Sequence, residues 1–151
     1  MKLLIRDTVP TDLEALRDVF RRSSLSNEDD RANLLANPDA LELSDISSKE
    51  SHRRVAALAD GRIVGFVTGL IAGKAIELDD LFVDPDYWGK GIGRALMLDV
   101  VEIARKQGAL RIEVTANEHA LGFYEKAGFV FDREVETRFG PALRMHLELG
   151  A

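Results

Sequence analysis

The sequence predicts a mixed α/β domain in which a β-sheet is covered by helices. First, short apolar segments typical of strands alternate along the chain with segments whose apolar residues recur at helical spacing. Second, the chain has 151 residues, 46% of them hydrophobic and 30% charged, as expected for a globular domain with a real core. We find no repeat, linker or composition break, and therefore expect a single domain spanning 1–151.

A short strand is expected over residues 3–6, followed by a helix over about 11–22. Thr11 and Glu14 have the spacing of a capping box, in which two side chains bond backbone N–H groups at a helix start. The apolar residues of this helix recur at helical spacing: Leu13, Leu16, Val19 and Phe20.

Residues 23–51 form a polar, acidic segment that contains no glycine. We expect a short helix before Asn37-Pro38 and a second one after it. An ordered structure and a mobile flap both remain open for this segment.

A hairpin is expected next, because two apolar runs over 54–59 and 62–70 flank Asp60-Gly61. Another strand is expected over 75–83. A helix over 94–107 then carries its apolar residues on one face and ends at Gly108.

The last part of the chain begins with a strand over 110–114, where apolar residues alternate with period two. A helix over 119–127 ends at Gly128, and two strands over 129–137 and 143–149 close the fold. The expected order is β-α-(α)-β-β-β-α-β-α-β-β.

The composition excludes several classes of function. The net charge is −6, which makes the chain a poor candidate for binding nucleic acid and suits a cationic or amine partner. There is no cysteine, so disulfides, a thiolate nucleophile and cysteine-ligated metals are excluded. The three histidines show no ligand spacing, and no metal is expected. No signal or membrane-spanning segment is evident, so we expect a cytoplasmic protein with no membrane partner.

A glycine-rich turn over Trp88 to Gly93 lies between a predicted strand and a predicted helix. Glycines at alternate positions leave backbone N–H groups pointing outward, and the helix dipole adds positive charge, so the turn suits a phosphate or pyrophosphate. A Walker loop is excluded because Gly91 stands after Lys90 where Ser or Thr is required. A dinucleotide fingerprint is excluded because Leu96 stands at the third glycine position.

The stretch from Glu77 to Gly128 resembles the GNAT superfamily of acetyl-CoA-dependent N-acetyltransferases. One motif is Leu-Phe-Val-Asp-Pro over 81–85 together with the glycine turn after it, and a second runs from Asn117 through Phe123-Tyr124 to Gly128-Phe129. The chain departs from the family pattern at Trp88, where Arg or Gln is usual.

This resemblance implies a mostly antiparallel, twisted sheet that is splayed between two strands and flanked by helices on both faces. It also implies direct acetyl transfer from acetyl-CoA, as co-substrate, to an amine in a ternary complex. The residues implied to bind the co-substrate are Leu81, Phe82, Val83, Gly89, Lys90, Gly91, Ile92, Gly93, Arg94, Ala95, Asn117, Phe123 and Tyr124.

The resemblance places Tyr124 in the role of general acid, which protonates the leaving thiolate. The base is a carboxylate or a water held by one: Glu77 and Asp80 rank nearly equal, ahead of Asp79 and then Glu113. Strict alternation places Glu77 and Asp79 on one face of their strand and Asp80 on the other, whereas a bulge would shift that phase.

The resemblance further implies a small-molecule or peptide amine as the acceptor, and homodimers are common in the family. Glu42 or Asp45 is a candidate for attracting a cation, and the turn at Phe139-Gly140-Pro141 is a candidate wall of the acceptor site. Two alternatives remain open: a non-catalytic acyl-CoA-binding sensor module on the same fold, and a transferase that uses another acyl group or a hydroxyl acceptor.

Overall fold

A computed structural model describes residues 1–43 and 51–150, apart from the side chains of Glu28 and Asp29. The described chain contains a seven-stranded sheet in the order β1-β2-β3-β4-β5-β7-β6. Neighbouring strands are antiparallel except for β4 and β5. The strands are β1 (Leu3–Asp7), β2 (Ser51–Leu58), β3 (Ile63–Ala72), β4 (Ala75–Val83), β5 (Arg111–Ala116), β6 (Val130–Thr137) and β7 (Gly140–Glu148).

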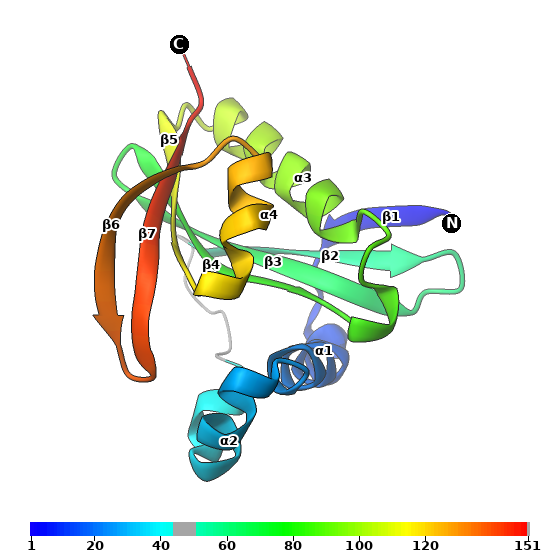
Figure 1. The fold of residues 1–151 in the computed structure, drawn as a ribbon. Helices are drawn as coiled ribbons and strands as arrows, with labels where there is room; N and C mark the ends of the chain where they lie inside the picture. Colours follow the sequence, from blue (N-terminus) through cyan, green and yellow to red (C-terminus); the bar gives the residue numbers. More distant parts are fainter. Residues whose placement is uncertain (44–50, 151) are drawn as a thin grey trace.

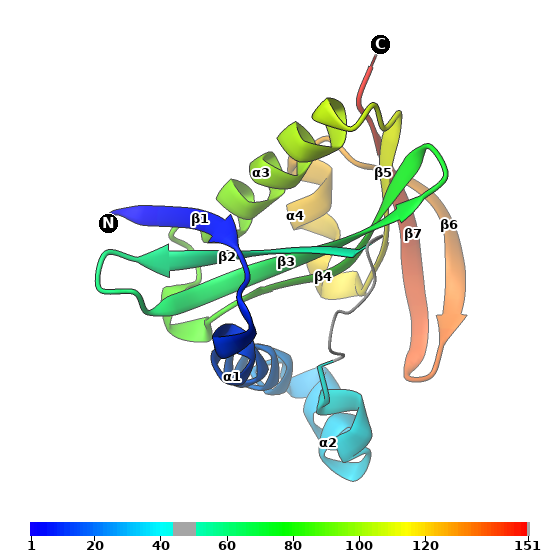
Figure 2. The same ribbon diagram turned by 180° about the vertical axis from the view of Figure 1, so that it is seen from behind.

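Helices cover both faces of the central strands, as Figures 1 and 2 show from opposite sides. Helices α3 and α4 lie on one face, and α1 and α2 lie on the other. Their bounds are α1 (Leu13–Leu25), α2 (Glu28–Ala36), α3 (Ile92–Lys106) and α4 (Leu121–Lys126). The mixed α/β class and the predicted element order are confirmed.

Two hydrophobic cores lie on opposite faces of the sheet because strand side chains alternate between the faces. Val55 and Phe66, both fully buried, pack with Leu16 and Val19 of α1. The next residues along β2 and β3, Ala56 and Val67, point the other way and belong to the core beneath α3 and α4. Burying each large apolar side chain contributes about 1.5–3 kcal/mol, so both helix layers are anchored by this alternation.

Strands β4 and β5 pair over only part of their length. The parallel register joins Ala75–Leu78 to Arg111–Val114 and then ends. Beyond it β4 continues along β3, while β5 continues along β7. The sheet therefore splays between β4 and β5, as the family resemblance implied.

A bulge in β4 changes which face its acidic residues occupy. Thr68 pairs with Asp80, whereas the next residue of β3, Gly69, pairs with Leu78, so Asp79 is an extra residue. Leu70 pairs with Glu77, and cross-strand partners share a face. Glu77 and Asp80 therefore lie on the same face. The expectation from strict alternation is wrong, and the alternative of a bulge is confirmed.

The first helix begins later than the sequence predicted. Residues Pro10–Asp12 form a 3-10 turn, η1, and α1 starts at Leu13. The buried Asp12 carboxylate accepts a 2.8 Å hydrogen bond from the Val9 amide and pairs with Arg6. The predicted Thr11–Glu14 capping box is therefore wrong, because the Asp12 carboxylate instead accepts the hydrogen bond of a backbone amide that precedes the helix.

The other helical predictions hold with local differences. The short helix before Asn37-Pro38 is α2, but the second predicted helix is a single 3-10 turn, η2 (Pro38–Leu41). The predicted helix over 119–127 is divided into the 3-10 turn η4 (Glu118–Ala120) and α4. Asp45 lies outside the described residues. No helix in the described ranges is long and apolar enough to cross a membrane.

Candidate active site

The glycine-rich turn connects β4 to α3, through the 3-10 turn η3 (Pro85–Tyr87). Gly89 and Gly91 have φ angles of 77° and 81°, a region that side chains with a Cβ rarely occupy. Within the described chain, the amides from Gly89 to Arg94 have no hydrogen-bond acceptor, whereas the Ala95 amide donates to Gly91 O at 3.0 Å. A row of free N–H groups therefore stands at the positive end of the α3 dipole.

A buried carboxylate anchors this turn to α1. Asp84, which is only 2% exposed, accepts a 3.0 Å hydrogen bond from the Asp86 amide at the start of η3. Arg22 of α1 donates to Asp84 at 2.7 Å and to Asp86 at 2.9 Å. The glycine turn is thus fixed to the helix on the opposite face of the sheet.

A cavity of about 600 Å³ opens beside the turn. The turn forms one wall through Gly89, Gly91 and Gly93, and the end of β4 and α4 form others. Gly93 allows α3 and α4 to approach closely, since a Cβ there would lie 3.2 Å from Cε1 of Phe123. Tyr124 of α4 also lines this cavity, so the anion-binding turn and the predicted acid share it.

Tyr124 is 7% exposed and makes edge-to-face contacts with Phe123 and Phe129, each at 5.2 Å between ring centroids. Burial raises the pKa of Tyr124 well above its usual value. Within the described chain its hydroxyl has no hydrogen-bond partner. The side chain is therefore fixed in place and carries its proton at neutral pH.

Trp88, the residue that departs from the family pattern, is half exposed and lies against the end of β4. Its Nε1 donates a 2.9 Å hydrogen bond to the Val83 carbonyl. The indole therefore caps a backbone acceptor of β4 and forms part of the wall of the cavity beside the turn.

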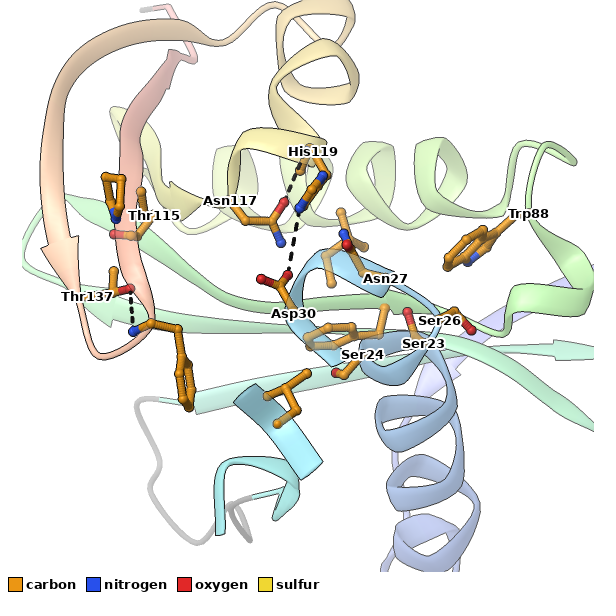
Figure 3. Close-up of a pocket in the computed structure, with 17 residues that line it drawn as sticks. Ser23, Ser24, Ser26, Asn27, Asp30, Trp88, Thr115, Asn117, His119 and Thr137 are labelled. Carbon is orange, nitrogen blue, oxygen red and sulfur yellow. Dashed lines mark hydrogen bonds and ion pairs between the residues drawn. The ribbon is translucent and has the colours of Figure 1, made fainter. Parts of the chain in front are cut away.

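A second cavity, of about 740 Å³, adjoins the first and shares Ser23, Leu81, Trp88, His119 and Ala120 with it. Figure 3 shows its polar lining, which comes mainly from the end of α1, the start of α2, β5 and η4. Phe139 and Pro141 of the predicted substrate wall lie on it. Asn117 also lines it, and its side chain accepts a 3.0 Å hydrogen bond from the Ala120 amide.

The carboxylates predicted as bases form ion pairs with arginines. Arg144 of β7 binds both carboxylate oxygens of Glu77 and lies 3.2 Å from Glu113. The buried Arg53 of β2 lies 3.3 Å from Asp80. Neither Glu77 nor Asp80 is among the described residues that line the two cavities. The structure thus groups the predicted acid with the glycine turn and places the predicted bases outside both cavities.

Asp79, the bulged residue, differs from these neighbours. The residue as a whole is exposed and has no ion pair within the described chain. Desolvation of its carboxyl, together with the smaller effects of the Asp80 and Glu77 charges, raises the pKa of Asp79. It does not line either cavity among the described residues.

Sequence reasoning missed one pair in the larger cavity. Asp30 of α2 lies 3.8 Å from Nε2 of His119, a residue that stands inside the second family motif. The position of His119 directly after Asn117-Glu118 was a usable signal. The approach of Asp30 was not, because it depends on how α2 packs.

Comparison with known proteins identifies the family. A model of the acetyltransferase (GNAT) family matches residues 13–129. Glucosamine 6-phosphate N-acetyltransferase of Trypanosoma brucei brucei is 41% identical over 76 residues, which are 46% of this chain and 52% of that protein. The chain thus spans about half the length of this relative. Peptidyl-lysine N-acetyltransferase YjaB of Salmonella typhimurium is 33% identical over 132 residues, 85% of this chain and 84% of that protein.

Solved structures share the fold over nearly the whole chain. PaiA N-acetyltransferase of Thermoplasma acidophilum, in complex with coenzyme A, is 24% identical and matches with a TM-score of 0.77 over 98% of this chain and 99% of that one. The ribosomal-protein-S18-alanine N-acetyltransferase of Escherichia coli is 21% identical, with a TM-score of 0.76 over 99% and 96%. With the family model matching most of its length, the chain belongs to the GNAT family of acetyltransferases.

Proposed function

We propose that this chain, as one domain, is an N-acetyltransferase that moves the acetyl group of acetyl-CoA directly to an amine in a ternary complex. One observation carries the proposal: the free amides of the glycine turn and the protonated Tyr124 line the same cavity. That cavity adjoins a second one with a polar lining, which gives the two substrates separate but neighbouring places.

Acetyl-CoA is a co-substrate whose pyrophosphate suits the amides from Gly89 to Arg94, and the Arg94 and Lys90 charges add attraction. Beyond the splay, the backbone of β4 from Leu81 to Val83 has no β5 partner. This backbone is our proposed site for the pantetheine arm, with Asn117 and Phe123 nearby. The oxygen of the acetyl carbonyl would meet a backbone donor there, as an oxyanion requires.

Tyr124 is our proposed general acid. The leaving group of the reaction is a thiolate, which has a reference pKa of about 8.5 and is a better leaving group once protonated. Since burial keeps Tyr124 protonated, the phenol can supply that proton. Because the Tyr124 phenol is neutral before the reaction, no charged side chain has to be kept in this apolar environment.

The acceptor amine must lose a proton before it attacks. For an alkylammonium with a pKa of about 10.4, this costs roughly 4–5 kcal/mol at pH 7. Glu77 and Asp80 remain our sequence-based candidates for the base, either directly or through a held water. Their arginine partners occupy carboxylate oxygens, so a group that lines the cavities is better placed for this role.

The acceptor class is an amine. The relatives named above are described as acting on glucosamine 6-phosphate and on peptidyl lysine, and a Thermoplasma acidophilum relative is named a spermidine N(1)-acetyltransferase. All of these substrates present an amine to the acetyl group. We therefore propose an amine acceptor without choosing among amino sugars, polyamines and lysine side chains.

The proposal is tested by CoA binding and by thiol release. We expect CoA to raise the melting temperature and an amine panel containing glucosamine, spermidine and a lysine peptide to release CoA thiol from acetyl-CoA. A protein whose melting temperature does not change in millimolar CoA would contradict the proposal.

A second candidate is a non-catalytic acyl-CoA-binding module. The arginine pairs of Glu77 and Asp80 favour it, because both predicted bases are engaged. This candidate predicts tight CoA binding with no thiol release for any amine in the panel.

A further inference from the structure

We infer that Asp30 and His119 receive the acceptor: the Asp30 carboxylate binds its ammonium group, and the His119 imidazole takes its proton. The inference rests on the proposed function and assigns a base that the sequence did not single out. It starts from one pair of side chains, on α2 and on η4, that face each other across the larger cavity (Figure 3).

The separation of the pair fits a nitrogen between them. Oδ2 of Asp30 and Nε2 of His119 are 3.8 Å apart, which exceeds a direct hydrogen bond. It is much less than the length of two hydrogen bonds of about 2.8–2.9 Å placed end to end. One ammonium nitrogen can therefore lie at hydrogen-bond distance from both atoms at once.

The position of His119 links the two cavities. Asp30 lines only the larger cavity, whereas His119 lines both. Tyr124 lines the smaller one, five residues further along the same η4–α4 segment. An amine held by Asp30 and His119 would thus stand where the acceptor cavity meets the cavity of the proposed acid.

The charged groups around the cavities support this division of roles. In the described lining of the larger cavity, Asp30 is the one carboxylate and His119 the one imidazole, and no lysine or arginine is present. The titratable groups that the neighbouring elements add to the smaller cavity are Tyr87 of η3, Arg94 of α3 and Tyr124 of α4. Of these side-chain types, imidazole is the one that can both accept and release a proton near neutral pH.

The proton balance is complete with these groups. The ammonium gives one proton to Nε2 of His119, and the neutral amine forms the C–N bond while the carbonyl electron pair moves to oxygen. The pair returns as the C–S bond breaks, and Tyr124 protonates the thiolate. The nitrogen loses a second proton, which replaces the one that Tyr124 gave. His119 releases its proton to solvent, so each turnover yields one proton.

The test uses His119→Gln and Asp30→Asn with a matched control. His52 forms the same kind of pair with Asp7, at 2.8 Å, but lines neither cavity, so His52→Gln controls for the loss of an imidazole. We expect His119→Gln to lower kcat by about 10²–10⁴-fold, as for loss of a general base, and to leave the Kd of CoA unchanged. Asp30→Asn should mainly raise the KM for the amine.

The pH profile separates catalysis from structure. With an imidazole as base, kcat/KM should fall towards acid pH, because a protonated imidazole cannot accept a proton. This acid limb should persist in His52→Gln and disappear in His119→Gln. Added imidazole should partly restore His119→Gly. Activity of His119→Gln within threefold of the parent, with its acid limb intact, would overturn the inference.

A measurement without turnover tests the pair even when no amine in the panel is acetylated. The chain has three histidines, so their ring signals in an NMR spectrum can be assigned with single His→Gln variants. Glucosamine, spermidine and the lysine peptide are each added with CoA, and at least one of them should shift the His119 signal and leave those of His52 and His146 in place. A His119 signal that none of these amines moves would overturn the inference, whereas missing thiol release alone would count against the proposed function.

Discussion

Nη1 of Arg22 lies 2.7 Å from Oδ2 of Asp84, and this pair joins α1 to the residue just before η3, which leads into the glycine turn. Asp84 is buried, and its carboxylate is already committed to the η3 backbone through the Asp86 amide. The position of the anion-binding amides therefore depends on an arginine 62 residues earlier in the chain.

Arg22→Ala is expected to lower both stability and CoA affinity. Within the part of the chain that the structure describes, the substitution leaves the buried Asp84 carboxylate with only Arg62, at 3.6 Å, as a cationic partner. An unsatisfied buried polar group costs about 1–3 kcal/mol, and the partial exposure of Arg22 favours the lower half of that range. Urea unfolding measures the loss, and calorimetry measures the Kd of CoA.

Arg138→Ala provides the control for Arg22→Ala. Arg138 also binds an aspartate, Asp39, at 2.7 Å, but both side chains are mostly exposed, and exposed pairs contribute little. Equal losses of stability in the two variants would contradict the anchoring role of Arg22.

Gly91→Ala and Gly122→Ala should have opposite effects on stability. Gly91 has a φ of 81° at the start of α3, where a Cβ costs about 1–2 kcal/mol. Gly122 lies within α4 in open space, where alanine gains up to about 1 kcal/mol through helix propensity. We expect Gly91→Ala to weaken CoA binding as well. Thermal unfolding with and without CoA measures both effects, and a neutral Gly91→Ala would argue against a strained turn.

Tyr124→Phe should separate chemistry from binding. The Tyr124 hydroxyl has no partner in the described chain and the ring packs between Phe123 and Phe129, so the variant should fold with little change in stability and bind CoA normally. We expect kcat to fall by about 10²-fold or more, as for loss of a general acid. A discontinuous activity assay measures the change in kcat, and a CoA titration measures whether CoA binding is unchanged. Full activity in Tyr124→Phe would exclude the phenol as the acid.

Local patterns in the sequence predicted the order of the elements and the glycine turn, because each depends on neighbouring residues, whereas Tyr124 was singled out by the resemblance to the family. The pairs of Glu77 with Arg144 and of Asp80 with Arg53 were not predictable, since they join residues 67 and 27 positions apart. In each pair the two residues lie on strands that are separated by one other strand of the sheet. The bulge at Asp79 had the same origin. It depends on the register with β3, and alternation along β4 alone gave the wrong face.

Asp12→Asn should flatten the acid side of the stability profile. The Arg6 side chain, 2.8 Å away, is the main cause that lowers the pKa of Asp12 below its ordinary value, and the Val9 amide acts in the same direction. A carboxyl whose pKa is lower in the folded state contributes stability above its unfolded pKa, about 3.9 for an aspartate, and loses it as the pH falls through the folded pKa. The parent protein should therefore lose stability below about pH 4 more steeply than Asp12→Asn, which has no charge to protonate. Urea unfolding from pH 7 down to about pH 2.5 gives both curves.

Glu14→Gln, near the start of α1, serves as the control because Glu14 has no ion pair within the described chain. Parallel curves for the parent and Asp12→Asn would show that the Arg6–Asp12 pair does not stabilise the folded state.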